Sequence, residues 1–208
     1  MSAATRLRRL SEKDEIIVFE KGPFVSFANC GLPYHISKTI KHRSQLIVQT
    51  ADDLRSRFNI DVRVNSEVTH IDRDNKMISV NHDDQQEKLY YDKLILSLGS
   101  SPVIPKIEGL HTQSNIFQLR NIPDLDNIMS HLDESIKTVA VLGAGFIGIE
   151  VTENLIKRGF SVNLIERSNQ ILPNLDIEMA QSITNELIKN DVRINTGTTI
   201  NKVSRDIL

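Results

Sequence analysis

Residues 138–167 constrain the fold of this 208-residue chain more than any other segment. The apolar run TVAVL at 138–142 is followed by GAGFIG at 143–148, which has the GxGxxG spacing, then by a helix-like segment and a second apolar run, SVNLI at 161–165. Glu166 follows this run. A glycine turn that joins a strand to a helix, with an acid after the next strand, is typical of a dinucleotide-binding unit. The segment therefore predicts an α/β fold with a parallel sheet.

The residues of the glycine turn have separate expected roles. Gly143 permits the tight turn, Gly145 lets the backbone approach a pyrophosphate, and Gly148 lets the helix pack against the strand. Phe146 and Ile147 open a helix whose N–H groups and partial positive charge point toward the phosphates. We therefore expect a dinucleotide at this turn. A glycine turn without a ligand is the alternative interpretation.

Glu166 and its neighbour bear on the choice of nicotinamide cofactor. The carboxylate would accept hydrogen bonds from the 2′-OH of the adenosine ribose and would repel a 2′-phosphate, which favours NADH. Arg167 follows directly, and a neighbouring Arg accommodates the 2′-phosphate of NADPH in related sites. The sequence therefore leaves NADH and NADPH open.

The start of the chain repeats part of this unit. The helix-like segment 1–15 and the strand-like run IIVFE at 16–20 correspond to the helix and second strand of the later unit, and both strands end in Glu followed by a basic residue. In the later unit the first glycine precedes Glu166 by 23 residues, so the same spacing from Glu20 falls before Met1. We therefore expect a strand and a glycine loop before Met1 in the complete protein. An ordinary N-terminal helix is the alternative.

Several other elements are expected from the hydrophobic pattern. Residues 61–96 contain the short runs DVRV, EVTHI, MISV, KLYY and KLILS, separated by polar turns, which predicts a β-meander. One side of the predicted N-terminal helix carries its apolar residues, which are Ala3, Ala4, Leu7 and Leu10. Further helices are expected at 51–58, 122–133 and 176–190, and a further strand at 192–195.

Composition argues against several classes of protein. The formal net charge of −2 gives no reason to expect a nucleic acid or a membrane surface as a partner. The apolar runs are too short to span a bilayer, and the first 15 residues lack the apolar core of a secretory signal. One cysteine in 208 residues excludes an internal disulfide framework and indicates the reducing cytosol. No metal site is expected.

Cys30 is this one cysteine, and a lone cysteine is most often a small buried hydrophobe. Here it precedes an apparent helix, whose N–H groups and dipole favour the thiolate. A dithiol site with the CxxxxC spacing needs a second cysteine at 25 or 35, where the sequence has Val25 and His35. A redox-active Cys30 must therefore cycle as a mixed disulfide with an external thiol or as a sulfenic acid.

The segment SFANCGLPY at 26–34 resembles the active-site segment of coenzyme A disulfide reductases, which belong to the pyridine-nucleotide disulfide oxidoreductase superfamily. Supporting matches are RLRRL at 6–10, YDKLILSLGSSP at 91–102, LRN at 119–121 and VLGAGFIGIE at 141–150. The resemblance covers essentially the whole chain. It implies two dinucleotide-binding, Rossmann-like domains with parallel sheets and a β-meander insertion, both incomplete, in a cytoplasmic homodimer.

The resemblance assigns residues 1–120 to an FAD-binding domain that lacks its first strand and glycine loop, and 121–208 to a C-terminally truncated NAD(P)-binding domain. It implies flavin-dependent reduction of coenzyme A disulfide, or of a related low-molecular-weight disulfide, by NADH or NADPH. The family's later FAD segment and its C-terminal dimerisation domain are absent from this sequence. NADH oxidases, peroxidases, polysulfide reductases and rhodanese-fused reductases remain open, as does an inactive fragment that at most binds a dinucleotide.

The resemblance also implies roles for individual residues. Cys30 is the expected redox nucleophile. The residues expected to contact coenzyme A are Ser2, Arg6, Arg9, Ser26 and Asn29. The first three share one helix face, where two guanidinium groups could clamp phosphates; a solvated basic face is the alternative. The residues expected to contact FAD are Glu20, Lys21, Ser97, Gly99 and Arg120. Those expected to contact the nicotinamide cofactor are Gly143, Gly145, Phe146, Ile147, Gly148, Glu150 and Glu166.

Overall fold

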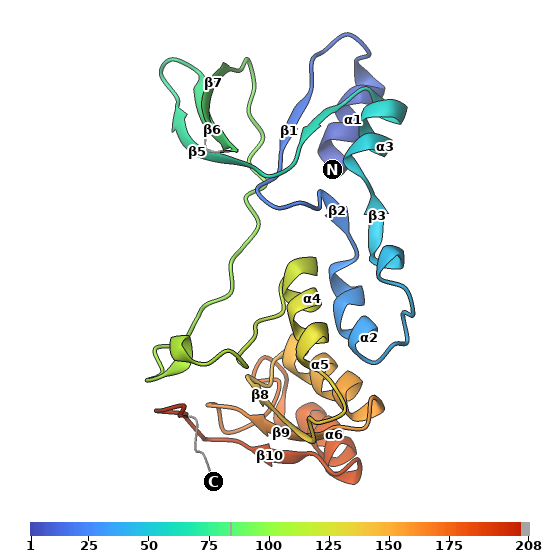
Figure 1. Ribbon diagram of the computed structural model, residues 1–208, viewed down its shortest axis with the longest axis vertical. Helices are drawn as coiled ribbons and strands as arrows, with labels where there is room; N and C mark the ends of the chain where they lie inside the picture. The colour runs from blue at the N-terminus through green and yellow to red at the C-terminus, as the bar shows by residue number, and fades with distance from the viewer. Residues whose placement is uncertain (84, 205–208) are drawn as a thin grey trace. The chain divides into compact units, whose positions relative to one another are not determined.

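The computed structural model of the chain describes residues 1–83 and 85–204. The described chain forms two compact units. The first contains Met1–Ala28 and Ser44–Ser100, and the second contains Asn29–Arg43 together with Ser101 and the described residues after it. Each unit has its own helices and strands (Figure 1), so each is described by itself.

The first unit combines two helices with short strands and a meander. Its elements are α1 (Ser2–Leu10), β1 (Ile17–Phe19), β2 (Ser26–Phe27), β3 (Ile47–Gln49), α3 (Ala51–Phe58), β4 (Asp61–Arg63), β5 (Ser66–Asp72), β6 (Met77–His82) and β7 (Gln85–Tyr90). β1 pairs with β4 in parallel, β2 pairs with β3 antiparallel, and β5, β6 and β7 form the antiparallel meander. Leu54, Ile60 and Val62 are buried in its core, against which Met1 and Ala4 pack.

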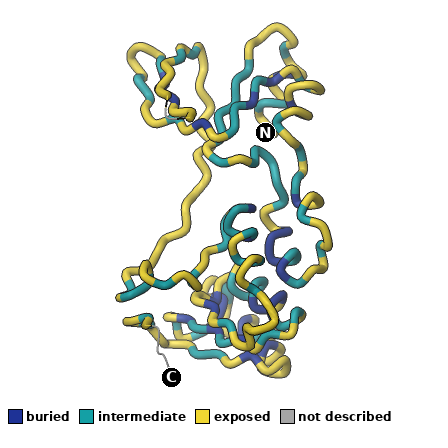
Figure 2. Tube along the Cα trace, in the orientation of Figure 1, coloured by how far each residue is buried: buried dark blue, intermediate teal, exposed yellow. Residues whose placement is uncertain are grey.

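Two expectations for residues 61–96 are corrected. The run DVRV does not belong to the meander, because β4 pairs with β1. The run KLILS forms no strand among the described residues, and Leu96 and Leu98 are 57% and 83% exposed. Figure 2 shows this stretch after β7 in the colour of exposed residues. An apolar run becomes a strand only where a neighbour supplies backbone hydrogen bonds, and no described strand pairs with this one.

Helix α1 lies where it is expected, but its buried side is not the predicted apolar side. Leu7 and Leu10 are exposed, whereas Arg8 is buried. The Nε of Arg8 donates to the carbonyl oxygen of Phe58 over 2.9 Å, and its Nη2 donates to that of Asn59 over 2.8 Å. These carbonyls end helix α3 and have no partner within it. The buried side of α1 is therefore set by α3, which the helical period of α1 cannot reveal.

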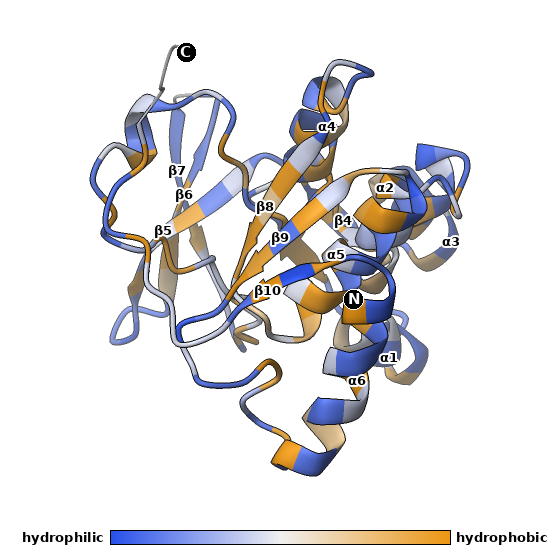
Figure 3. Ribbon diagram, turned by 90° about the horizontal axis from the view of Figure 1, so that it is seen from below, coloured by the Kyte–Doolittle hydropathy of each residue, from blue (hydrophilic) through white to orange (hydrophobic). Residues whose placement is uncertain are grey.

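The second unit contains the predicted strand, glycine turn, helix and strand. Its elements are α2 (Leu32–Ile36), α4 (Ile122–His131), β8 (Thr138–Leu142), α5 (Phe146–Lys157), β9 (Ser161–Ile165), α6 (Ile177–Lys189) and β10 (Arg193–Asn195). The strands pair in parallel in the order β10–β9–β8, and α5 packs on β8 and β9. Hydrophobic residues run along β8 and β9 (Figure 3), and Val141, Val162 and Leu164 are buried. The predicted parallel α/β arrangement is confirmed.

Helix α2 packs on α5 and α4, which places residues 29–43 in the second unit. The guanidinium of Arg43, after α2, forms a bidentate ion pair with the carboxylate of Asp126 in α4, with N–O distances of 2.6 and 2.7 Å. Packing thus divides the chain differently from the predicted ranges 1–120 and 121–208. Those ranges concern which cofactor each part binds, and they stay a prediction.

Helices α5 and α6 have 12 and 13 residues. Within the described ranges, no helix combines the length and the apolar character that crossing a bilayer requires. Short 3₁₀ turns complete the regular structure, at Asn29–Gly31, Arg43–Leu46 and Leu110–Thr112.

Candidate functional site

The glycine turn at 143–148 joins β8 to α5. Gly143 has a φ of +93°, in the left-handed region that favours glycine. A Cβ atom on Gly148 would overlap the carbonyl oxygen of Gly143, so the helix can lie this close to the turn only with glycine there. A Cβ atom on Gly143 or Gly145 would meet no atom within 4 Å, so the space beside these residues is open. An open turn at a helix N-terminus fits an approaching pyrophosphate.

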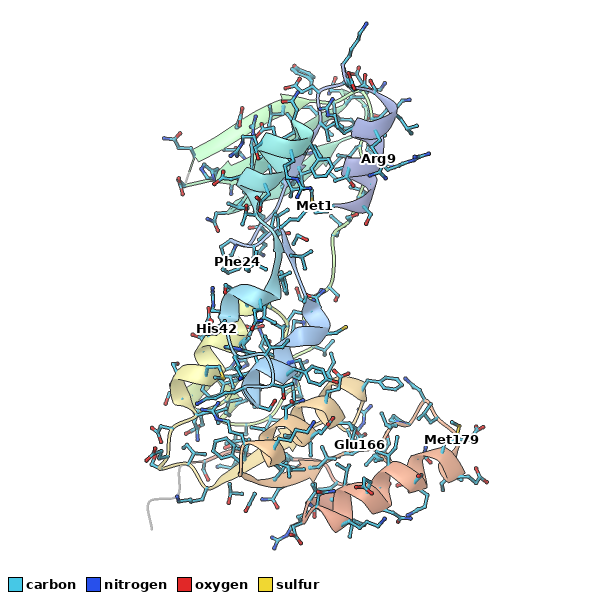
Figure 4. The ribbon with its side chains drawn as sticks, turned by 90° about the vertical axis from the view of Figure 1, so that its right-hand side faces the viewer. Met1, Arg9, Phe24, His42, Glu166 and Met179 are labelled. Carbon is cyan, nitrogen blue, oxygen red and sulfur yellow. The ribbon has the colours of Figure 1, made fainter. Side chains whose placement is uncertain are left out.

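Glu166 directly follows β9 and is only 9% exposed (labelled in Figure 4). Its Oε2 accepts the backbone N–H of Ala144 in the glycine turn over 2.7 Å, and its Oε1 accepts that of Ser168 over 2.7 Å. Burial by itself would raise the pKa of Glu166, but these hydrogen bonds and the charge of Arg167 outweigh it and lower the pKa. An ionised carboxylate therefore links the glycine turn to the segment after β9.

Cys30 lies in the 3₁₀ turn Asn29–Gly31, immediately before α2, and is exposed. This confirms its predicted position ahead of a helix. Cys30 lines a hollow of about 140 Å³ within the second unit. The other lining residues are Asn29, Leu32, Pro33, Leu119, Arg120, Ile147 and Glu150. Five of the predicted site residues, from three separate parts of the chain, are thus brought together: Asn29, Cys30, Arg120, Ile147 and Glu150.

Helix α5 and the residue that follows it contribute one stripe of side chains to this region. The stripe has the spacing i, i+3, i+7 and i+11 and consists of Ile147, Glu150, Asn154 and Arg158. Its first two members line the hollow, and its last donates to the carbonyl oxygen of Ile36 in α2 over 3.3 Å. Asn154, between them, is fully buried, and its Nδ2 donates to the carbonyl oxygen of Glu150 over 2.8 Å. In the described part of the chain, its Oδ1 has no hydrogen-bond partner.

The segment before α4 is held by a capping box. Oδ1 of Asn121 accepts the backbone N–H of Asp124 over 2.9 Å. In return the Asp124 carboxylate accepts the backbone N–H groups of Asn121 and Arg120, over 3.2 and 2.9 Å. The box satisfies N–H groups that a helix start leaves without partners. It therefore fixes the backbone that carries Leu119 and Arg120 to the hollow.

The candidates for coenzyme A binding on α1 are all exposed. Ser2, Arg6 and Arg9 lie on one face, and Figure 4 shows Arg9 projecting away from the helix. Arg8, between the two arginines, is the one that is buried against α3. The face thus presents two guanidinium groups on a helix that is anchored from its other side.

The FAD candidates of the first unit lie near the end of β1 and after β7. The Oε1 of Glu20 accepts the backbone N–H of Gly22 over 2.7 Å. The Nζ of Lys21 pairs with the carboxylate of Glu67 at 2.9 Å, with both side chains well exposed. The remaining FAD candidates, Ser97 and Gly99, lie in the exposed segment after β7. Ser26, which is a candidate for coenzyme A binding, lies in β2.

Three residues that shape the second unit were not predicted from the sequence: Asn121, Asn154 and Arg158. The cap at Asn121 has a local signal, because Asn, Pro and Asp in the order N-x-P-D mark a helix start. Asn154 and Arg158 have none. Their importance depends on where α2 packs, and α2 is more than 100 residues away in the sequence.

Two curated relatives match nearly the whole chain. Coenzyme A disulfide reductase of Staphylococcus aureus (strain COL) is 36% identical over 207 residues, which are 98% of this chain and 46% of the relative. NADH oxidase of Methanocaldococcus jannaschii is 32% identical over 206 residues, again 98% of this chain and 46% of the relative. The chain therefore spans less than half the length of these relatives.

Solved structures agree with the fold. Reduced CoADR-RHD of Bacillus anthracis matches with a TM-score of 0.94 and 43% identity, over 97% of this chain and 37% of that one. The NAD-dependent persulfide reductase of A. fulgidus matches with a TM-score of 0.89 and 31% identity, over 97% and 38%. An engineered water-forming NADPH oxidase, bound to NADPH and derived from an NADH oxidase, matches with a TM-score of 0.90 and 25% identity, over 97% and 45%.

One family description covers the chain almost from end to end. The profile described as "Pyridine nucleotide-disulphide oxidoreductase" matches residues 1–207. The parallel βαβ unit with its glycine turn, the acid after β9 and the cysteine ahead of α2 agree with this description. The chain therefore belongs to the pyridine nucleotide-disulphide oxidoreductase family.

Proposed function

We propose that the complete protein reduces coenzyme A disulfide, or a related low-molecular-weight disulfide, with NADH or NADPH as donor, FAD as carrier and Cys30 as its single redox-active thiol. The observation that carries the proposal is the place of Cys30. Cys30 is exposed and lines a hollow whose other lining residues include Ile147 and Glu150 of α5, the helix that starts at the glycine turn. An inert cysteine is usually buried, whereas a redox-active thiol must be accessible.

The glycine turn supports the nicotinamide part of the proposal. The residues that would hold the pyrophosphate are those of the open turn, Gly143 and Gly145 with the N-terminus of α5. Phe146 and Ile147 start the helix and are 60% and 59% exposed, so a ligand can reach them. Glu150, one turn further along, lines the hollow and would contact the nicotinamide end.

FAD fits this chain in part. The hollow beside Cys30 and Arg120 offers open space for the edge of a flavin ring. Glu20 stands after β1, in the place that corresponds to Glu166 after β9. The sequence contains one GxGxxG motif, at 143–148, so these 208 residues do not supply a second glycine turn for the FAD pyrophosphate. FAD, when bound, supplies two-electron transfer between NAD(P)H and a disulfide.

The thiol chemistry uses one cysteine. The Cys30 thiolate attacks one sulfur of the substrate disulfide, forms a mixed disulfide with coenzyme A and releases the first coenzyme A thiolate. Two electrons, which originate from one NAD(P)H, then cleave the mixed disulfide, regenerate the Cys30 thiolate and release the second coenzyme A thiolate. One NAD(P)H, one proton and one disulfide give one NAD(P)⁺ and two thiols.

The exposed face of α1 supports coenzyme A as the thiol component. Coenzyme A carries several phosphate groups, and guanidinium groups bind phosphate oxygens with paired hydrogen bonds. Arg6 and Arg9 are exposed together with Ser2, and Arg8 anchors the helix by bonding the carbonyl oxygens at the end of α3. In this proposal Ser26 and Asn29 contact the thiol end of the coenzyme, since they precede Cys30 by four residues and one residue in the sequence.

A second candidate function uses the same thiol for oxygen, peroxide or polysulfide. Its support is the 32% identity to the NADH oxidase of Methanocaldococcus jannaschii and the 31% identity to the persulfide reductase of A. fulgidus. In such a reaction Cys30 would pass through a sulfenic acid or a persulfide instead of a mixed disulfide with coenzyme A. The nicotinamide and flavin parts of the site stay the same.

We also propose that the chain accepts NADPH as well as NADH. The engineered NADPH oxidase carries five substitutions. A glycine was replaced by Ala, and an Asp 18 positions later was also replaced by Ala. The two residues after that Asp were replaced by Arg and Ser, and a proline 7 positions after the Asp was replaced by Arg. The present chain has Gly148, Glu166 and Pro173 at the same spacings. Arg167 and Ser168 therefore align with the introduced Arg and Ser. The chain keeps an acid for NADH and already carries the two polar residues of the NADPH form.

A cytosolic homodimer completes the proposal. The single cysteine suits a reducing compartment, and the family resemblance implies a partner subunit. Light scattering after size exclusion of the full-length protein tests the dimer.

The serine variant of Cys30 tests the function. In the full-length protein Cys30→Ser changes one atom, so the fold and the bound FAD are expected to remain, while NAD(P)H-dependent reduction of coenzyme A disulfide is lost. Mass spectrometry of the unreduced protein should find an adduct of coenzyme A mass on Cys30. Ser182→Ala, at an exposed position of α6 in the same unit, serves as the matched control and should keep full activity.

Two outcomes would contradict the function. Reduction of coenzyme A disulfide by the serine variant at the parent rate would exclude the one-thiol mechanism. A Cys30 without adduct, combined with full peroxide or polysulfide turnover, would favour the second candidate function instead.

A further inference from the structure

The second residue of the glycine turn, Ala144, is held from two directions by the segment that follows β9. Its N–H donates to Oε2 of Glu166 over 2.7 Å, and its carbonyl oxygen accepts the N–H of Leu172 over 2.7 Å. Ala144 is fully buried, and both partners are buried as well. Water therefore cannot replace either bond if the protein partner is lost.

Glu166 has both carboxylate oxygens committed to backbone. While Oε2 accepts the N–H of Ala144, Oε1 accepts the N–H of Ser168 over 2.7 Å. The chain at Glu166 is itself fixed, because its N–H donates to Asn195 and its carbonyl oxygen accepts from Thr198, both in or just after β10. The position of the carboxylate is therefore set by the protein on every side and does not depend on a ligand.

We propose that Glu166 is a positioning residue that holds the glycine turn in its pyrophosphate-binding shape, a role distinct from any contact of the carboxylate with the adenosine ribose. The inference rests on the nicotinamide function proposed above, because it assigns the turn to a pyrophosphate. It deepens that function by separating two tasks. Glu166 shapes the turn for NADH and NADPH alike, and the neighbouring Arg167 distinguishes between them.

The physical reason lies in what the turn loses without a carboxylate. Glutamine has nearly the same size as glutamate, but only one of its two terminal atoms accepts a hydrogen bond and the other is an NH₂ donor. In Glu166→Gln, one of the N–H groups of Ala144 and Ser168 therefore faces another donor. A buried N–H without an acceptor is unfavourable, so the turn shifts until the group is satisfied. The donors at the start of α5 then no longer converge on a pyrophosphate.

Two roles of Glu166 predict different responses to a ligand without the adenosine 2′-OH. If Glu166 only reads the ribose, Glu166→Gln weakens the binding of NADH and leaves the binding of 2′-deoxyadenosine NADH unchanged. If Glu166 positions the turn, the variant weakens both ligands by the same factor, because both carry the pyrophosphate. The comparison forms a thermodynamic cycle between one side chain and one hydroxyl group.

The experiment measures both ligands on the full-length wild-type protein, on Glu166→Gln and on Glu153→Gln. Glu153 is the matched control, because it lies exposed on α5 in an ion pair with Lys157 at 2.6 Å. We expect Glu166→Gln to raise the Kd of NADH and of its 2′-deoxy analogue by about tenfold each, with kcat within about twofold and the KM for NADH raised like the Kd. The control should leave all four quantities unchanged. A loss confined to NADH overturns the positioning role.

Backbone hydrogen exchange in the unliganded protein gives a readout that needs no cofactor turnover. The N–H groups of Ala144 and Ser168 should exchange slowly in the wild type and in Glu153→Gln, and faster in Glu166→Gln. If the wild type binds neither ligand, the proposed nicotinamide function fails, and the exchange data alone decide the positioning role. If Glu166→Gln does not fold, the wild type still decides it, because free exchange at Ala144 overturns the inference.

Discussion

The guanidinium of Arg158, directly after α5, donates to the carbonyl oxygen of Ile36 at the end of α2, over 3.3 Å and across 122 sequence positions. The same group donates to the carbonyl oxygen of Leu132, directly after α4, over 2.7 Å. Both carbonyls lie at helix C-termini, where backbone oxygens lack partners within their own helix. The side chain of Arg158 thus joins α5, α2 and α4, and α2 is the helix that Cys30 precedes.

Replacing Arg158 tests this junction. Arg158→Met keeps an aliphatic stem but removes every donor, so two helix-terminal carbonyls lose their partner. We expect the free energy of unfolding, measured by urea denaturation, to fall by about 1–3 kcal/mol. Arg158→Lys should lower the free energy of unfolding by less, because its ammonium group can replace some of the hydrogen bonds that the guanidinium donates. Arg193→Ala, at an exposed position of β10, should stay within about 0.5 kcal/mol of the wild type. Equal stability of Arg158→Met and wild type would mean that the junction contributes nothing.

Asn154 should tolerate an apolar replacement better than a charged one. Its Oδ1 has no partner among the described residues, and the residue, which lies in α5, is fully buried. Asn154→Leu removes this carbonyl at similar size, so the free energy of unfolding should change by less than about 1 kcal/mol. Asn154→Asp should lower it by about 3 kcal/mol or more, because it places an unpaired charge in the same space. Thermal and urea unfolding check both values, and a large loss in the leucine variant would show that the amide is needed.

The pKa of Glu166 predicts how its contribution depends on pH. The pKa is lower in the folded chain than its ordinary value of 4.5, because the N–H groups of Ala144 and Ser168 outweigh burial. The ionised carboxylate therefore stabilises the fold above pH 4.5, and this stabilisation is lost as the pH falls through the lower folded pKa. The difference in free energy of unfolding between the wild type and Glu166→Gln should be largest near pH 7 and shrink at acidic pH. A difference that is constant from neutral to strongly acidic pH would contradict this.

Arg167 should govern the use of NADPH. It is exposed beside Glu166, where it can pair with a 2′-phosphate. Arg167→Ala in the full-length protein should lower kcat/KM for NADPH by about tenfold and leave kcat/KM for NADH within about twofold. Lys189→Ala removes an exposed cation from α6 in the same unit and should change neither value. An equal loss for the two cofactors would show that Arg167 acts through general charge and does not read the phosphate.

The two arginines of α1 should matter only for a substrate that carries phosphate. Arg6→Ala combined with Arg9→Ala should raise the KM for coenzyme A disulfide by about tenfold or more and leave kcat nearly unchanged. The disulfide of pantetheine has no phosphates, so its KM should not change. Lys13→Ala, an exposed cation after α1, serves as the control. Identical effects on both substrates would remove Arg6 and Arg9 from the coenzyme site.

The sequence by itself determined the central βαβ unit of the chain. The apolar strands, the three glycines and the acid lie within 30 residues, so all the signals for β8, α5 and β9 are local. A glycine turn needs particular backbone angles and space, and both requirements can be read from residue types alone. For the same reason the sequence placed Cys30 just before a helix: the Gly and Pro that set the start of α2 are its neighbours.

The tertiary structure alone decided which partner each element meets. The period of α1 does not reveal that Arg8 is buried and Leu7 is not, because the carbonyls that Arg8 binds are 50 and 51 residues away. The run DVRV does not reveal that its strand pairs with β1. The run KLILS does not reveal that no described strand pairs with it. These outcomes depend on contacts between distant segments, and local pattern carries no information about them.

Glu166 shows both sources of information in one residue. The sequence predicted an acid at the end of the second strand that contacts a ribose, because ligands of parallel sheets bind at the carboxyl ends of the strands. Only the folded chain brings Glu166 within 2.7 Å of Ala144, 22 residues earlier, and of Ser168, so that both oxygens bind backbone. The residue type alone does not indicate whether a carboxylate accepts hydrogen bonds from a ligand or from a peptide N–H. The burial and direction that the sheet imposes on it make that choice.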